Sequence, residues 1–129
     1  MAARRVRELR GTERFVGEVT GWGVNMGSHV HAFELQQAGH LHTHVVVADV
    51  FTDFGWVGGL LGRGDSISVM GARRAYASLL PEHQQAVSAA RGRVGRGANE
   101  RDIVIVASEI FVDPYTLQRI TSGDERLSG

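Results

Sequence analysis

Three histidines occupy alternate positions in the stretch HLHTH, at His40, His42 and His44. In a β-strand, side chains two positions apart point to the same face and lie about 6.8 Å apart. Two imidazoles at that separation can bind one zinc ion, and Glu34 on a neighbouring strand could add a third ligand. Three such histidines span too far for one ion, so the candidate metal ligands are His42, His44 and Glu34.

Two other interpretations of this stretch are open. Histidine can stack on a base or donate to a phosphate, so His42 and His44 could contact nucleic acid. Alternatively, they form the polar side of a strand that faces water. The choice depends on which face of the sheet carries them.

The stretch belongs to a predicted hairpin. Residues 29–37 and 41–51 both have strand character, and only Ala38-Gly39-His40 separates them, which is typical of a tight turn. We expect Phe33, Leu35, Val45 and Val47 to face the core. The outer wall would then carry the polar residues of both strands, which are Glu34, Gln36, His42 and His44. A second alternating pair, His29 and His31, is expected near a rim of the structure.

Arginine supplies all fourteen basic residues, and fourteen acidic residues balance them, so the formal net charge is zero. This balance excludes a generically basic nucleic-acid binder. GC-rich coding would explain an arginine bias, but guanidinium groups also pair with phosphate and stack on bases. In ARGRVGRGANER, each of Arg91, Arg93 and Arg96 could neutralise a phosphate beside glycines that permit close approach. The alternative is a solvated, mobile loop.

Aromatic residues provide further candidates. Trp22 lies in the segment GWGVNMGS with Asn25, and its indole is either a lid on the end of the structure or a stacking platform. Tyr76 follows Arg73-Arg74, and the three could clamp a phosphate and stack a base. The remaining aromatic residues near the apolar connector are expected to plug the core: Phe51, Phe54 and Trp56.

Five valine- and isoleucine-rich segments predict strands, at residues 14–24, 29–37, 41–51, 65–76 and 101–112. The glycine-rich connector 52–64 predicts an irregular plug. The insertion 77–100 is compatible with a helix that starts at Pro81 and then becomes rich in glycine and arginine. A short helix is predicted after Pro114. The chain is therefore mainly all-β.

This order of elements resembles the OB-fold family. The residues that carry the resemblance are 16–19 (VGEV), 33–35 (FEL), 45–49 (VVVAD), Leu61 with 64–71 (GDSISVMG), and 103–110. The resemblance implies a five-stranded Greek-key barrel over residues 14–112, with a short helical insertion between strands four and five. It also implies binding on the outer face of strands two and three, beneath the loop between strands four and five. Glycine at positions 17 and 71 would permit the sharp bends that such a barrel needs.

Length and composition predict one domain, preceded by a basic arm (residues 1–13) and followed by a tail (residues 113–129). The absence of cysteine excludes disulfides, thiolate nucleophiles and cysteine-based zinc sites. No apolar run is long enough for a membrane span, and a cytoplasmic location is expected by default. Phosphate-loop, nucleophile-elbow and His-Glu-x-x-His motifs are missing, so we expect neither an enzyme nor a cofactor.

The predicted function is binding of single-stranded DNA or RNA with little sequence preference. The alternative is a protein-interaction or assembly module, either a homo-oligomer or a subunit of a complex; a histidine-based metal-binding protein is less favoured. The predicted nucleic-acid contacts are Trp22, Asn25, His42, His44, Arg73, Arg74, Tyr76, Arg91, Arg93 and Arg96.

Overall fold

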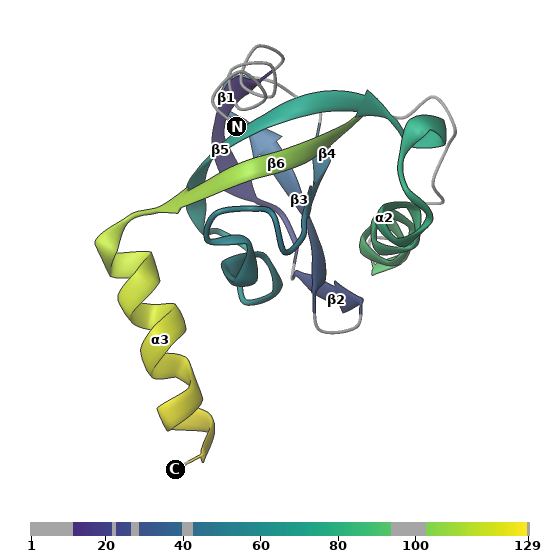
Figure 1. Ribbon diagram of the computed structural model, residues 1–129. Helices are drawn as coiled ribbons and strands as arrows, with labels where there is room; N and C mark the ends of the chain where they lie inside the picture. Colours follow the sequence, from purple (N-terminus) through teal and green to yellow (C-terminus); the bar gives the residue numbers. More distant parts are fainter. Residues whose placement is uncertain (1–11, 22, 27–28, 40–42, 94–102, 129) are drawn as a thin grey trace.

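The computed structural model describes residues 12–21, 23–26, 29–39, 43–93 and 103–128, with the backbone alone at residues 93 and 123–128. Its strands are β1 (Glu13–Val19), β2 (Val24–Met26), β3 (Val30–Gln37), β4 (Thr43–Ala48), β5 (Ser66–Ala75) and β6 (Ile103–Val112). Its helices are the 3-10 turns η1 (Gly55–Gly59) and η2 (Tyr76–Ser78) and the α-helices α2 (Pro81–Arg93) and α3 (Pro114–Ser128). Figure 1 shows their arrangement.

Five of these strands close into a barrel, in the order β1-β3-β4-β6-β5 and back to β1. The β4–β6 pair is parallel and the other pairs are antiparallel, while the short β2 extends the sheet beside β3. The predicted five-stranded OB-like barrel is confirmed. The helical insertion also lies where it was predicted, between the fourth and fifth barrel strands, because α2 connects β5 to β6.

Strand β1 closes the barrel by pairing with two neighbours at once. Gly17 pairs with Gln37 of β3 on one side and with Ile67 of β5 on the other. A Cβ at this position would lie 2.1 Å from the carbonyl oxygen of Gln36, so only glycine fits. Gly71 follows a register shift between β5 and β6. Both predicted bends therefore occur at glycine, where close backbone approach requires it.

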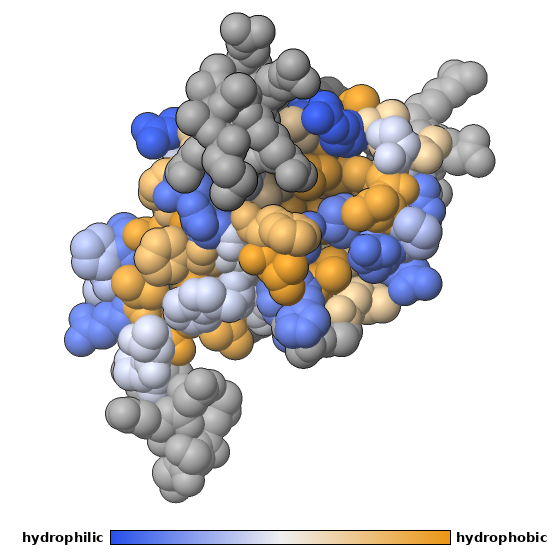
Figure 2. All heavy atoms as spheres, viewed as in Figure 1, coloured by the Kyte–Doolittle hydropathy of each residue, from blue (hydrophilic) through white to orange (hydrophobic). Residues whose placement is uncertain are grey.

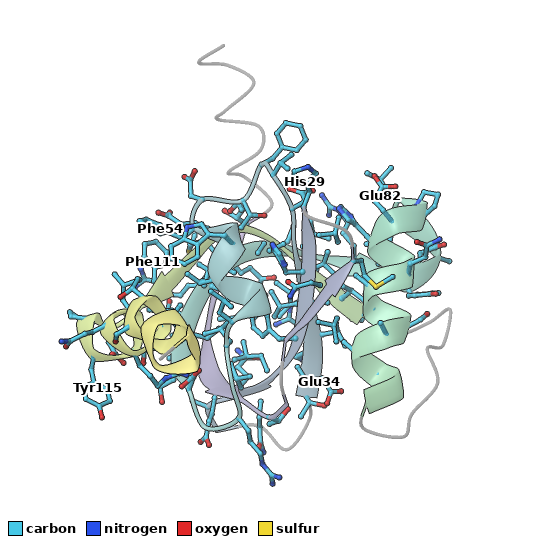
Figure 3. The ribbon with its side chains drawn as sticks, turned by 90° about the horizontal axis from the view of Figure 1, so that it is seen from below. His29, Glu34, Phe54, Glu82, Phe111 and Tyr115 are labelled. Carbon is cyan, nitrogen blue, oxygen red and sulfur yellow. The ribbon has the colours of Figure 1, made fainter. Side chains whose placement is uncertain are left out.

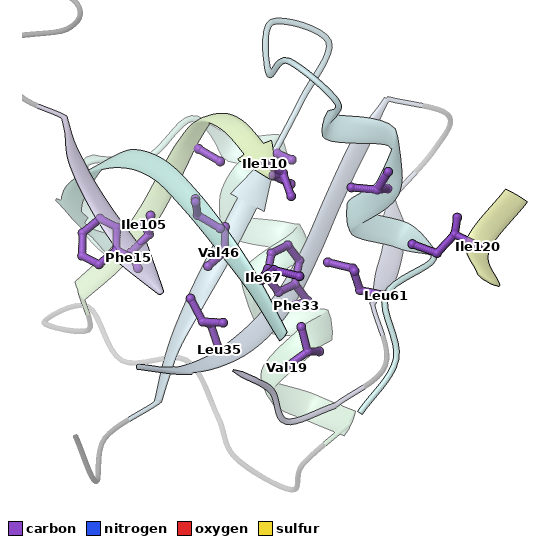
Figure 4. Packing of buried hydrophobic residues seen from close by; sticks show 14 residues of the cluster. Phe15, Val19, Phe33, Leu35, Val46, Leu61, Ile67, Ile105, Ile110 and Ile120 are labelled. Atoms are coloured by element: carbon purple, nitrogen blue, oxygen red, sulfur yellow. The ribbon is translucent and has the colours of Figure 1, made fainter. Parts of the chain in front are cut away.

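The barrel interior is packed with apolar side chains from every wall (Figure 4). Phe33 and Leu35 of β3 meet Val46 of β4 there. The connector between β4 and β5 closes one end with Val57 and Leu61, both completely buried. This part of the connector is the plug that the sequence predicts.

A second apolar layer lies outside the barrel, where α2 packs on the outer face of β3 and β4 (Figure 1). The sheet contributes Ala32, Val45, Val47 and Val104, and the helix contributes Ala86, Val87 and Ala90. The prediction of a polar outer wall is therefore wrong. All four residues from Val45 to Ala48 are buried because the inner face meets the core and the outer face meets α2.

The tail contains a longer helix than the sequence predicts. Helix α3 starts after Asp113, whose carboxylate accepts a hydrogen bond from the Thr116 N–H at 2.6 Å and caps the first turn. Ile120 anchors the helix to the barrel core, and Arg119 pairs with Asp65. The helix then extends away from the barrel (Figure 1). Within the described ranges, no helix combines the length and apolarity needed to cross a membrane.

Candidate binding surface

The structure separates the histidine and glutamate that the metal-site interpretation combined. His44 lies opposite Leu35, on the inner face of the sheet near the end of the hairpin, whereas Glu34 lies opposite Val45, on the outer face. The placement of His44 corrects the predicted wall and that of Glu34 agrees with it, so His44 and Glu34 cannot share an ion across the sheet. His42 lies outside the described residues. Within the described part of the chain, no cluster of three or more histidine or acidic residues could hold a metal ion.

Tyr76 and Arg91 belong to the α2 layer and are not exposed contacts. The Tyr76 ring packs against the apolar residues under α2, and its hydroxyl lies 3.0 Å from the Ser88 hydroxyl. Arg91 is a buried residue within α2, where the sequence predicted a mobile loop. Arg93 is the last residue of that helix. Arg96 and Trp22 lie outside the described residues, so their roles stay predictions.

Arg73 and Arg74 remain at the surface near the end of β5. The Arg73 guanidinium pairs with the Glu13 carboxylate at 3.1 Å and lies 5.3 Å from the centre of the Phe15 ring. Arg74 donates to the carbonyl of Arg73 at 3.3 Å. The predicted clamp with Tyr76 is not formed, because the Tyr76 hydroxyl is directed to α2.

Aromatic side chains expected in the core are instead exposed on the connector. The exposed fractions are 87% for Phe51, 54% for Phe54 and 48% for Trp56. Phe54 has a left-handed backbone conformation with φ of 58°, which turns the chain into η1. Val57 occupies the core position in that turn, so the prediction that these three rings form the plug is wrong.

Hydrogen bonds hold the connector that presents these rings. The Asp49 carboxylate accepts from the Phe51 N–H at 2.9 Å, and the Thr52 hydroxyl donates to the Ala107 carbonyl at 2.8 Å. Asp53 pairs with β6, donating its N–H to the Ser108 carbonyl at 2.9 Å and accepting from the Ile110 N–H at 3.0 Å. The connector backbone is thereby held against β6, so this backbone needs little ordering when a ligand binds.

The exposed rings of the connector and β6 are Phe51, Phe54, Trp56 and Phe111, and we call them the aromatic surface. Figure 3 places Phe54 next to Phe111, in agreement with the bridge between Asp53 and Glu109. The Arg14 guanidinium lies 5.5 Å from the centre of the Phe111 ring. In Figure 2, hydrophobic side chains gather between polar ones on this face of the barrel.

A small pocket adjoins this surface at the rim of the barrel. Its volume is about 250 Å³, and it is lined by His29, His31, Asp49, Val50, Thr52, Gly55 and Trp56. The two histidines come from the start of β3, where the sequence predicted a rim position. We call this site the rim pocket.

Polar contacts set the chemistry of the rim pocket. The Nδ1 atom of His31 is hydrogen-bonded to the Oδ1 atom of Asn25, another predicted contact residue. Gly59 leaves room for this pair, since a Cβ there would lie 1.9 Å from Asn25 Oδ1. Burial lowers the pKa of His31, and the neighbouring His29 lowers it further. His31 is therefore neutral at neutral pH.

Asp49 links the rim pocket to α2. Its second carboxylate oxygen accepts a hydrogen bond from Nε2 of the buried His83 at 3.0 Å. The sequence analysis proposed neither Asp49 nor His83 as a contact residue. The only signal for Asp49 was its place directly after a run of apolar strand residues.

No protein-family model and no curated protein matches this chain. Solved structures do. A small single-stranded DNA-binding protein from Streptomyces coelicolor is 18% identical, covers 81% of this chain and 94% of its own, and has a TM-score of 0.52. OBody AM2EP06, bound to hen egg-white lysozyme, is 15% identical over 78% of each chain with a TM-score of 0.50. These similarities establish the OB fold of the barrel.

Proposed function

We propose that this protein binds single-stranded nucleic acid with little sequence preference, through the aromatic surface. The observation that carries the proposal is the exposure of Phe51, Phe54 and Trp56 on a hydrogen-bonded connector. Stacking of a base on an aromatic ring contributes about 1–3 kcal/mol and tolerates every base, because each has a flat face. A protein that binds in this way needs no active site, and we propose a binding role without catalysis.

The proposed surface differs from the face that the sequence resemblance implied. Helix α2 closes the outer face of β3 and β4, so a strand of nucleic acid would have to follow the connector and the rim. Arg14, beside Phe111, supplies a cation at this surface. The similarity to a small single-stranded DNA-binding protein supports this class of ligand.

Charge at the surface favours stacking over phosphate neutralisation. Asp53 and Glu109 lie side by side where the connector meets β6, and they would repel phosphates there. For a single strand, each phosphate that the protein neutralises adds about −0.7 to the slope of the logarithm of the binding constant against the logarithm of the salt concentration. We expect the surface to make few such contacts and the salt dependence to be shallow.

The test is fluorescence anisotropy of a labelled mixed-sequence strand with the double variant Phe51→Ala/Phe54→Ala. Loss of two stacking rings, at about 1–3 kcal/mol each, should weaken binding by at least about 30-fold. Both rings are exposed, so the fold should persist. Tyr115→Ala, which removes an exposed ring on α3, is the matched control and should leave binding unchanged. Equal affinity of the double variant and the wild type would refute the proposal.

The second candidate is a protein-interaction or assembly module. Exposed phenylalanine and tryptophan side chains are also what a protein partner buries. The OBody bound to lysozyme is an OB-fold protein in complex with a protein. If no strand binds at micromolar protein, and the wild type but not the double variant self-associates in sedimentation analysis, this candidate replaces the first.

A further inference from the structure

The rim pocket has the size and walls of a site for one flat ring system. Its volume of about 250 Å³ is below the roughly 300–1,000 Å³ of sites for drug-sized ligands. The half-exposed indole of Trp56 forms one wall, and the imidazoles of His29 and His31 form others. Aromatic walls of this kind take up planar rings by stacking.

The charge of the pocket disfavours a phosphate. Asp49 contributes a carboxylate to the lining, and His31 is neutral at neutral pH because its pKa is lowered by burial. A doubly charged phosphate would meet the Asp49 charge without a fixed cation among the lining residues. An uncharged heterocycle meets no such penalty.

The pocket lining offers hydrogen-bond acceptors at His31 and Asp49. Asn25 Oδ1 can only accept, so the Nδ1 atom of His31 carries the proton, and Nε2 is left with its lone pair. The Asp49 carboxylate has about four acceptor positions, and the Phe51 N–H and His83 use two of them. The Thr52 hydroxyl already donates to Ala107 and accepts from the Asp49 N–H. A ligand that donates hydrogen bonds can therefore use both His31 Nε2 and the Asp49 carboxylate.

We infer that the rim pocket binds one unstacked base that carries an exocyclic amino group, such as cytosine or adenine, against Trp56. The amino group donates to His31 Nε2 and Asp49. This inference rests on the proposed function and adds to it a preference for amino-bearing bases over uracil and thymine at one position of the bound strand.

The first experiment compares deoxycytidine and deoxyuridine oligomers of equal length at pH 8, where His31 is neutral because its pKa is lowered. The two bases differ at the exocyclic amino group and the adjacent ring nitrogen. We expect the cytosine strand to bind about tenfold more tightly. Equal affinities would overturn the inference and leave the proposed function intact.

Variants of Asn25 test the positioning of the acceptor. Asn25→Ala releases His31 Nδ1 and should reduce the cytosine preference, with little change in uracil-strand affinity. Asn25→Asp keeps an oxygen that accepts from Nδ1–H and should retain the preference. Asn25 is exposed on the three-residue β2, so both variants should fold. The role assigned to His31 is contradicted if both variants keep the cytosine preference, or if both lose it equally.

A free nucleotide separates failure of the pocket from failure of the proposed function. Trp56 is the single tryptophan in a Trp22→Phe background, since the chain has two. Cytidine monophosphate should quench its fluorescence more strongly than uridine monophosphate, and a parallel histidine NMR titration should shift His31. Quenching without strand binding would support the pocket and refute the proposed function; strand binding without quenching or a His31 shift would do the reverse. If neither occurs, both are refuted.

Discussion

Two surfaces flank the same barrel and differ in what covers them. The outer face of β3 and β4 carries small and branched apolar residues beneath α2, together with the buried Glu34. The barrel end carries Phe51, Phe54 and Trp56, which face solvent beside a polar pocket. Both regions are rich in apolar side chains, so composition does not distinguish them. The insertion between β5 and β6 covers the first region and leaves the second exposed.

The comparison shows that a helical insertion can determine which parts of one barrel architecture stay open to solvent. A helix that packs on one wall removes that wall from solvent and stabilises it by about 25 cal/mol for each Å² of apolar area buried. An exposed ring on the connector contributes little to folding. The covered face should therefore control stability, and the open end should control binding.

The sharpest test of this division introduces the same side chain in both regions. Val87→Asp places a carboxylate in the apolar layer under α2 and should reduce the free energy of unfolding by ~3–5 kcal/mol. Phe51→Asp changes an exposed side chain and should change it by less than about 0.5 kcal/mol while weakening strand binding. Urea unfolding measures both. Similar losses of stability would mean that the two regions are not distinct.

A smaller effect is expected when the contact between Tyr76 and α2 is weakened. Tyr76→Phe removes the hydroxyl that contacts Ser88 and Gln84, and should cost about 1 kcal/mol. Hydrogen exchange of the α2 amides should accelerate. Tyr115→Phe, on an exposed ring, is the control and should alter neither quantity. Unchanged exchange in the Tyr76 variant would show that the hydroxyl does not hold the helix.

The smallest effect concerns pH at the open end. The pKa of His31 is lowered in the folded protein, below its ordinary value of 6.5, by burial and by His29. As the pH falls below about 6.5, the unfolded chain takes up the proton first, so the free energy of unfolding decreases. His31→Gln should remove this part of the decrease. Urea unfolding at pH 7.5 and pH 5.5 compares the two proteins. Equal decreases in the free energy of unfolding of the wild type and His31→Gln would contradict the burial of His31.

The strand positions, the Gly17 and Gly71 bends and the helix start at Pro81 were predictable because they depend on local rules. Valine and isoleucine favour strands, glycine tolerates close approach, and proline suits a first helical turn. The division into a basic arm, barrel and tail stays a prediction.

Alternation alone could not predict which side chains of β4 face the barrel core and which face α2. Val45, Val46, Val47 and Ala48 are all buried, and such a run has no polar side to mark its outer face. The continuous run was itself the signal that both faces are covered. The predicted inner and outer faces of β4 are reversed, because the prediction places the histidines on the side that faces water.

By itself, the sequence determined a mainly all-β chain with five barrel strands, a glycine-dependent closure and a helical insertion, because these follow from residue preference and spacing. Only the tertiary structure decided that α2 covers the outer face of β3 and β4, that Phe51 and Phe54 face solvent, and that His31 meets Asn25. These features depend on contacts between segments far apart in the chain. The total apolar area that the folded protein buries selects those contacts.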